Sequence, residues 1–232
     1  MDLIVFGARL SRAATSDFPR RSARQSLALL ARVAAAFTLI ELIVVIMIIA
    51  VLAGLAFPVF QTVQNSAKKT QAKNDLTQIV TAVNAYYTEY GKYPIATDDT
   101  PISPTADVFY ALRALSRGAN TADVLNARKI VFLSPREANN PSQPKAAIAS
   151  QDATVNGVAI KAGEFVDPWG SPYKLAIDGN YDNQIDTNPY GANNGAGPQP
   201  LRQGVICWSL GKDQQLGVNG KFTGSDDIIS WQ

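Results

Sequence analysis

The stretch FTLIELIVVIMIIAVLAGLAF, residues 37–57, decides the fold of this chain of 232 residues. Its 21 positions contain a single charged residue, Glu41. A helix of this length rises about 30 Å, which is enough to cross the hydrocarbon core of a bilayer. A buried helix of a soluble protein rarely runs this far without a polar face. Residues 37–57 therefore predict one transmembrane helix.

The 36 residues before this helix differ from it in composition. They hold six arginines and two aspartates, a net charge of +4. Such a basic flank stays cytoplasmic, which orients the helix with its C-terminal end outward. A Sec signal peptide is the alternative, but its apolar region is shorter, and small residues follow it. Here Ala34, Ala35 and Ala36 come before the apolar run. Residues 1–36 are therefore predicted to be a targeting leader outside the fold.

Beyond residue 57 the chain becomes polar but keeps helical spacing. Apolar residues recur at steps of three and four, at Leu76, Ile79, Val80, Val83, Tyr87 and Tyr90. Gly91 is a suitable C′ residue, and Pro94 prevents the helix from continuing. We predict that residues 58–90 form the amphipathic half of one long helix, whose apolar stripe packs on a globular head.

Two residues inside the predicted helix weaken it. Pro58 removes an intrahelical hydrogen bond and should kink or loosen the backbone. Gly54, one turn earlier, adds conformational freedom. The alternative interpretation of Pro58 is a boundary between two separate helices.

Glu41 is the unusual residue of the apolar segment. A carboxylate in hydrocarbon is costly and usually marks a function or a fixed partner. Glu41 lies four residues after Phe37, so a cut before Phe37 would place a new α-ammonium one helical turn away. The two charges would then neutralise each other within a chain or between packed chains. The alternative is a tolerated interfacial glutamate near the end of the helix.

The composition excludes several classes of function. The chain has no histidine and one cysteine, Cys207, which excludes Ser-His-Asp and Cys-His catalysis, an internal disulfide and a cysteine metal cluster. A net charge of +2 provides no general attraction to nucleic acid. We find no nucleophile–base pair and no phosphate loop, so an enzyme is not expected.

Residues 36–41, Ala-Phe-Thr-Leu-Ile-Glu, follow a basic leader and resemble the signature of the type IV pilin and pseudopilin superfamily. The resemblance implies that prepilin peptidase cuts between Ala36 and Phe37 and that the new N-terminus is methylated. It also implies that Glu41 sets subunit registration and that Pro58 is where the helix bends or melts on assembly. The family usually has glycine at the position of Ala36, so we expect slower cleavage. The leader is also long for the family.

The C-terminal part narrows the resemblance to the major pseudopilin of type II secretion. The matching runs are YYTEYGKYP at residues 86–94, DPWGSPY at residues 167–173 and WSLGKD at residues 208–213 with SDDIISW at residues 225–231. We assign residues 167–173 a structural role, because two prolines and a glycine fix a turn and Trp169 covers core.

The secondary structure predicted for the head is a short helix followed by strands. The helix falls at residues 109–115, and residues 139–163 are predicted as loop with a possible turn at Asn156-Gly157. Strands follow at residues 173–177, 205–210 and 227–231. Cys207 is expected to be a buried thiol. The predicted fold class is α+β: the long N-terminal helix packed on a small antiparallel β-sheet head, residues 91–232.

The resemblance implies a calcium site in the C-terminal loop, built from carboxylates and backbone carbonyls. The residues at the matching positions are Asp213, Asp226, Asp227 and the carbonyl of Leu210, with Gln215 and Ser225 as weaker candidates. Calcium prefers such hard oxygen ligands. The alternative is a solvated acidic loop. Because Cys207 has no partner, a calcium-braced loop would replace the disulfide of many type IVa pilins.

Residues 178–186, DGNYDNQID, are a second oxygen-rich run that partly matches an EF-hand loop. Asn183 replaces the glycine at position 6 of such a loop, and Pro189 stands where its bidentate glutamate belongs. A turn-rich insertion is the preferred interpretation, and weak calcium binding is a minor alternative.

The function implied by the resemblance is that of a structural subunit in a homo-oligomeric pseudopilus of a type II secretion-like system. Its partners would be prepilin peptidase, minor pseudopilins and the inner-membrane assembly platform, with no nucleic acid. The chain would span the inner membrane once, with a cytoplasmic N-terminus and a periplasmic head. The alternatives are a type IV pilus subunit for adhesion, motility or DNA uptake, and a membrane-anchored binding module.

Overall fold

A computed structural model describes residues 37–95 and 98–232, so the predicted leader lies outside the described residues. The described residues fall into two units, one that ends at Ala50 and one that runs from Val51 to Gln232. Helix α1 (Leu39–Tyr90) begins in the first unit and ends in the second.

The N-terminal part of α1 is apolar and exposed on all sides. Its large apolar side chains are between 43% (Ile43) and 76% (Leu39) exposed. Within the described residues, α1 is the one helix that is long and apolar enough to cross a membrane, with a mean hydropathy of 3.0 over 18 residues and none of that window buried. The long apolar helix predicted from the sequence is therefore present.

Helix α1 continues without a break through Gly54 and Pro58. The alternative of two helices that meet at Pro58 is therefore wrong. A methyl group added at Gly54 would meet no atom within 4 Å, so packing in the single chain does not require glycine there. Bending at Pro58 on assembly stays a prediction.

In the second unit, α1 buries one stripe against the head, formed by Ala72, Leu76, Ile79, Val83 and Tyr86. The sequence-based stripe was wrong at its C-terminal end, because Tyr86 is fully buried while Tyr87 is 39% exposed and stacks on Tyr93 with ring centroids 4.6 Å apart. Steps of four and three from Ile79 lead to Tyr86, and Tyr87 lies about 100° further round the helix. The helix ends as predicted, with Gly91 at φ +66°.

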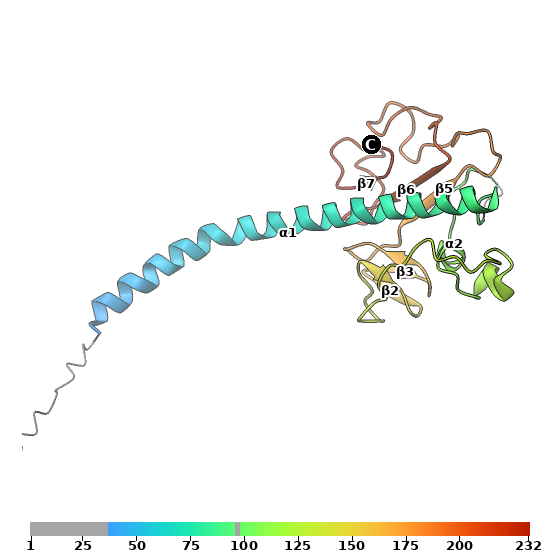
Figure 1. Ribbon diagram of the computed structural model, residues 1–232. Helices are drawn as coiled ribbons and strands as arrows, with labels where there is room; N and C mark the ends of the chain where they lie inside the picture. Colours follow the sequence, from blue (N-terminus) through green and yellow to red (C-terminus); the bar gives the residue numbers. More distant parts are fainter. Residues whose placement is uncertain (1–36, 96–97) are drawn as a thin grey trace, which may run out of the picture. The chain divides into compact units, whose positions relative to one another are not determined.

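The main sheet has three antiparallel strands, β5 (Lys174–Ile177), β6 (Val205–Ser209) and β7 (Ile228–Ile229), in the order β5-β6-β7. These strands confirm the three predicted from the sequence (Figure 1). Central strand β6 is buried along its whole length. Cys207 in β6 is fully buried, as predicted, and burial raises the pKa of its thiol well above the ordinary value.

Shorter elements complete the head. Helix α2 (Ala106–Leu112) is the predicted short helix, shifted by three residues, and the 3₁₀ segment η1 (Gly118–Asp123) follows it. Strand β1 (Ala147–Ile148) pairs with β4 (Phe165–Val166), and β2 (Ala153–Val155) forms a hairpin with β3 (Val158–Ile160).

The prediction that residues 139–163 are all loop was therefore wrong, since β1, β2 and β3 lie there. Each of these strands has two or three residues, too few for an alternating pattern to show in a sequence. The predicted turn at Asn156-Gly157 is confirmed, and both residues have positive φ, +51° and +85°, as a type I′ hairpin turn requires.

One core joins α1 to the head. Side chains of α1, α2, β5 and β6 form a single buried cluster, in which Tyr86, Phe109 and Tyr173 are the largest fully buried members. Figure 1 shows the second half of α1 running along these elements. The predicted α+β class, a long helix packed on small antiparallel sheets, is confirmed.

A buried carboxylate, that of Asp75 on α1, lies in this core and contacts the residue before β5. Asp75 is 8% exposed and accepts a hydrogen bond of 2.8 Å from the Tyr173 hydroxyl. Burial raises the pKa of the Asp75 carboxyl, and this outweighs the opposing effect of the hydrogen bond from Tyr173. The ionised form of Asp75 therefore destabilises the folded head.

We expect Asp75→Asn to raise the melting temperature of the head at pH 7. The amide can still accept the Tyr173 hydrogen bond, but it carries no buried charge. Because the pKa of Asp75 is higher in the folded than in the unfolded chain, its contribution makes the wild-type head more stable as pH falls from 7 toward about 4. Asp75→Asn should remove that part of the pH dependence, measured by thermal unfolding at pH 4 to 7.

The control is Asp152→Asn at an exposed ion pair. The hydrogen bond from Lys161 lowers the pKa of Asp152, so Asp152 contributes stability that is present at pH 7 and lost as pH falls through its folded pKa. Its neutralisation should shift the melting temperature at pH 7 downward. An Asp75→Asn protein that is less stable than the wild type at pH 7 would contradict the assignment.

Candidate processing site and metal centre

The start of α1 is closed by a reciprocal set of hydrogen bonds between Thr38 and Glu41. The Thr38 N–H and hydroxyl donate to Glu41 Oε2 at 2.9 and 2.7 Å, and the Glu41 N–H donates to Thr38 Oγ1 at 3.3 Å. This is a capping box, in which Thr38 is the N-cap and Glu41 is residue N3. The T-x-x-E spacing before an apolar run is readable in the sequence, and sequence reasoning missed it.

The predicted cleavage point adjoins this cap. Ala36 lies outside the described residues. Phe37 precedes the first helical residue and is 74% exposed. A cut before Phe37 would leave Thr38 and Glu41 as residues 2 and 5 of the shortened chain, so the capping box survives processing. The carboxylate therefore has a local role in addition to any partner that it gains afterwards.

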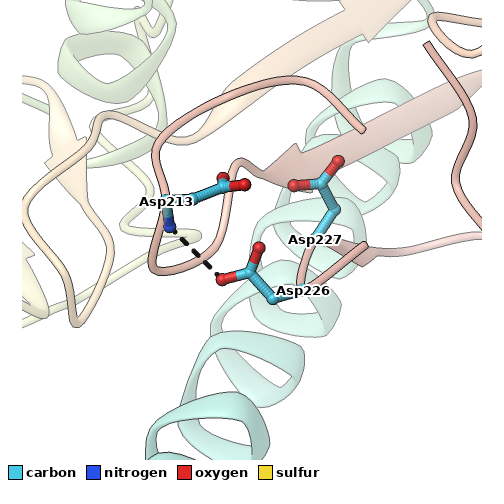
Figure 2. Close-up of side chains that lie close together, drawn as sticks. All are labelled: Asp213, Asp226 and Asp227. Atoms are coloured by element: carbon cyan, nitrogen blue, oxygen red, sulfur yellow. Dashed lines mark hydrogen bonds between the residues drawn. The ribbon is translucent and has the colours of Figure 1, made fainter. Parts of the chain in front are cut away.

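The three aspartates predicted as metal ligands lie together at the end of the main sheet. Asp213, Asp226 and Asp227 each offer one carboxylate oxygen, and the three oxygens lie within 4.8 Å of one another. Figure 2 shows the three carboxylates pointing toward a common space. Asp227 directly precedes β7, whereas Asp213 follows β6, so the loop between these strands folds back on itself.

Asp227 has one oxygen in use and one that lacks a partner. Its Oδ2 accepts hydrogen bonds from the Tyr190 hydroxyl at 2.8 Å and from the Gly217 N–H at 2.7 Å. Its Oδ1 is buried and has no hydrogen-bond partner, in a residue that is only 7% exposed. Burial raises the pKa of this carboxyl, and the nearby charges of Asp213 and Asp226 raise it as well. A buried, unpartnered carboxylate oxygen beside two other acids is what a bound cation would satisfy.

Backbone N–H groups of the loop orient the other two carboxylates. Asp226 Oδ2 accepts from the N–H groups of Lys212 and Asp213, and Asp213 Oδ1 accepts from the Gln215 N–H at 2.9 Å. Gly211 makes the fold of the loop possible. Its φ is +66°, and a Cβ there would lie 2.6 Å from the Asp226 carbonyl oxygen.

The DPWG turn anchors the start of this loop. Asp167 Oδ1 accepts from the N–H groups of Trp169, Gly170 and Ser171 at 2.8 to 2.9 Å. Its Oδ2 accepts from the Ser209 hydroxyl at 2.6 Å, and Ser209 Oγ in turn accepts from the Gly211 N–H at 3.1 Å.

Asp167 itself is fully buried, and burial raises the pKa of its carboxyl despite these four donors. The turn has the structural role predicted for it, and Trp169 lies in the core as expected. Sequence reasoning missed its hydrogen-bonded link to the loop that carries the aspartates.

The remaining predicted ligands have other contacts. The Ser225 hydroxyl donates to the Phe222 carbonyl at 2.8 Å, and Gln215 contributes its backbone N–H to Asp213. Leu210 packs against the apolar cluster of β6 and β7. Ligation of a metal by Leu210, Gln215 or Ser225 stays a prediction.

The second oxygen-rich run, residues 178–186, forms a series of bends, with one bridge from Ile185 to Leu201. Asp178 accepts from the N–H groups of Asp182 and Asn183, and Asp99 accepts from those of Gly179 and Asp186. These carboxylates stabilise the turns, in agreement with a turn-rich insertion. In residues 37–95 and 98–232, Asp213, Asp226 and Asp227 are the one group of three acids close enough to share a metal ion.

The geometry of this group suits calcium. All of its ligand atoms are oxygens, and calcium takes six to eight hard oxygen ligands in flexible geometry, including carbonyls and waters. Two of the three carboxylates are at least partly exposed, which leaves room for water to complete the shell. Zinc prefers nitrogen and sulfur ligands, and the chain has no histidine and one buried cysteine.

Comparisons with known proteins bear on the N-terminal end of the chain. A search of curated proteins and a search of solved structures found no match. A family model described as the prokaryotic N-terminal methylation motif matches residues 32–57. This range covers the predicted cut, the capping box and the apolar start of α1. Residues 32–57 thus carry the N-terminal methylation motif that is the signature of type IV pilin and pseudopilin precursors.

Proposed function

We propose that this chain is the structural subunit of a pseudopilus in a type II secretion-like system, with a head braced by calcium. The observation that carries the proposal is the methylation motif at the start of an apolar helix exposed on every side. The assignment to type II secretion is supported by the DPWG turn and the aspartate cluster, whose sequence runs resemble those of the major pseudopilin.

The apolar part of α1 supplies the assembly surface. Large apolar side chains from Phe37 to Val63 are exposed in the single chain. In the inner membrane, lipid covers them, and in a filament neighbouring copies of the same helix cover them. Lipid tails are as apolar as these side chains, so association within the membrane depends on close packing of the helices and on charge pairing at Glu41. Where the filament leaves the bilayer, contact between copies keeps the same apolar surface away from water. The head then remains on the outer, periplasmic side.

Calcium would be held by Asp213, Asp226 and Asp227, and it would supply charge neutralisation rather than chemistry. The cation would join the start of the loop, after β6, to its end, before β7. A chain with one buried cysteine cannot use a disulfide for this purpose. Prepilin peptidase, minor pseudopilins and the assembly platform are the partners that this role requires.

Blocking the cut should abolish secretion. We expect co-expression with prepilin peptidase to give a product that begins with methylated Phe37. Ala36→Leu should prevent cleavage, because a bulky side chain replaces the small residue before the cut, and it should stop export of the type II cargo in the bacterium that encodes the chain. N-terminal mass spectrometry and assay of the secreted cargo measure the two effects.

The control is Ala36→Gly, which should leave both cleavage and secretion intact. A mature N-terminus other than Phe37 would contradict the pilin-type assignment. Intact secretion in the Ala36→Leu strain, with loss of adhesion, motility or DNA uptake, would instead identify a type IV pilus subunit.

A further inference from the structure

We propose that Tyr190 is a positioning residue of the calcium site, which holds Asp227 so that its free oxygen faces the cation. Tyr190 lies in the long connection between β5 and β6, outside the loop that carries the three aspartates. The inference rests on the calcium role proposed above and adds a residue that no family motif in the chain includes.

The two carboxylate oxygens of Asp227 differ in their contacts: Oδ2 accepts hydrogen bonds, and Oδ1 accepts none. The Tyr190 hydroxyl donates to Oδ2 at 2.8 Å, and the Gly217 N–H donates to the same oxygen at 2.7 Å. Two donors on Oδ2 fix the rotation of the carboxylate. The buried Oδ1 is left without a partner and is therefore the oxygen available to a cation. A partner that orients a ligand in this way is usual around metal sites.

The ring of Tyr190 is held rigidly enough to act as such a donor. Tyr190 is 2% exposed and lies edge-on to Phe222 with ring centroids 5.3 Å apart. On another side its ring centroid lies 6.3 Å from that of Trp231. Because aromatic neighbours fix the ring, the position of the hydroxyl is set by packing before a cation binds.

The backbone around Tyr190 is also tied to the aspartate loop. The Asn194 carbonyl accepts from the N–H groups of Phe222 and Thr223 at 2.9 and 3.2 Å. The Asn194 side-chain amide donates to the Tyr190 carbonyl at 2.6 Å. Residues 190–194 therefore contact the aspartate loop at two places. Tyr190 binds the side chain of Asp227, and Asn194 binds the backbone of the loop.

A purely structural role for Tyr190 makes a different prediction. In that case the hydroxyl would stabilise the folded head equally with and without calcium. A positioning role affects the affinity for the cation and leaves the packing of the ring in place. Measurement of affinity and of stability without calcium separates the two.

The test is Tyr190→Phe in the full-length chain in detergent. We expect its calcium affinity, measured by isothermal titration calorimetry, to fall about tenfold, since loss of a partner that orients a ligand typically costs 10- to 100-fold. Terbium luminescence, excited through the aromatic side chains, should show the same loss for a lanthanide probe. The melting temperature without calcium, followed by tryptophan emission, should fall only by the loss of one buried hydrogen bond. The fall in melting temperature should be larger when calcium is present.

The matched control is Tyr110→Phe, which removes another tyrosine hydroxyl from the head. Tyr110 donates to the Ala162 carbonyl at 2.8 Å, and among the described residues no hydrogen bond joins it to Asp213, Asp226 or Asp227. Its calcium affinity should equal that of the wild type. Equal affinity in Tyr190→Phe and wild type, or an equal fall in Tyr110→Phe, would overturn the inference.

A second variant, Asn194→Ala, tests the inference without altering Tyr190. It should also weaken calcium binding, and it should add little to the loss in a Tyr190→Phe background, because both act through one carboxylate. Full additivity of the two losses would overturn the inference. A wild-type chain that binds neither calcium nor terbium would overturn the calcium site itself, a failure distinct from that of Tyr190.

Discussion

Removal of calcium should lower the melting temperature of the head by about 5–10 °C. A ligand present at about 100 times its dissociation constant stabilises the folded state by about 2.7 kcal/mol, and a domain of this size shifts by about 2–4 °C per kcal/mol. The physical reason is the Asp213, Asp226 and Asp227 cluster, in which three carboxylates converge and one oxygen of Asp227 is buried without a partner. Chelation leaves these charges to repel one another.

Tryptophan emission is a selective measurement for this experiment. The three tryptophans, Trp169, Trp208 and Trp231, all lie in the head and none lies in α1. Thermal unfolding of the full-length chain in detergent can therefore be followed without interference from the apolar helix. The expected result is one melting transition that moves upward when calcium is restored.

Asp227→Asn should raise the melting temperature of the head, relative to the wild type, when calcium is absent and lower it when calcium is present. Without calcium, the variant should melt at a higher temperature than the wild type, because burial disfavours the charged form of Asp227 and the amide removes that charge. With calcium, the variant should show little further stabilisation. The control is Asp186→Asn, because Asp186 belongs to residues 178–186 and not to the aspartate cluster. Calcium should raise the melting temperature of this variant as much as that of the wild type. A wild-type head that is indifferent to chelator would contradict the calcium site.

The long helix could be predicted from the sequence because its signal is strong and local. A segment of 21 residues with one charge specifies an apolar helix whatever surrounds it. The exact buried face was harder to predict. Tyr86 and Tyr87 are adjacent and chemically equal, so only the packing of the head decides which of them is buried.

Some strands of the head could be predicted from local sequence patterns, and others could not. Strands β5 and β6 are four and five residues long and were found from their β-branched and aromatic residues. Strands β1, β2 and β3 have two or three residues each, and their pairing depends on partners that no local pattern reveals. The Asn156-Gly157 turn was found because its backbone conformation is encoded in the two residues themselves.

For the candidate metal site, the sequence could suggest ligands but could not predict which distant residues contact them. Asp213 was matched to Asp226 and Asp227 by resemblance, and their proximity depends on a loop that folds back at Gly211. Tyr190 is 37 residues away from Asp227 and carries no motif, so only the structure brings the two together. The Thr38 and Glu41 capping box, by contrast, was present in the sequence as a local pattern.

Glu41→Gln should reduce filament assembly at least tenfold while leaving processing intact. Glu41 has one role that the structure shows and one that the sequence predicts, and this variant separates them. The first role is the capping box with Thr38, which requires only an acceptor at residue N3 and is served by glutamine as well as by glutamate. The second is neutralisation of the α-ammonium created at Phe37, which requires a negative charge. Glutamine keeps the first and removes the second.

Thr38→Val is the matched variant for the capping role. It removes the hydroxyl that pairs with Glu41, a loss of about 1 kcal/mol of helix stability, but it leaves the carboxylate in place. We expect Thr38→Val to assemble nearly as well as the wild type and Glu41→Ala to fail like Glu41→Gln. Sheared filaments quantified against processed subunit in the membrane measure the effect. Normal assembly of Glu41→Gln, with failure of Thr38→Val, would instead assign Glu41 to the cap alone. Charge pairing has the larger expected effect because Glu41→Gln leaves the α-ammonium of Phe37 unpaired in hydrocarbon, which costs more than the hydrogen bonds of one helix cap.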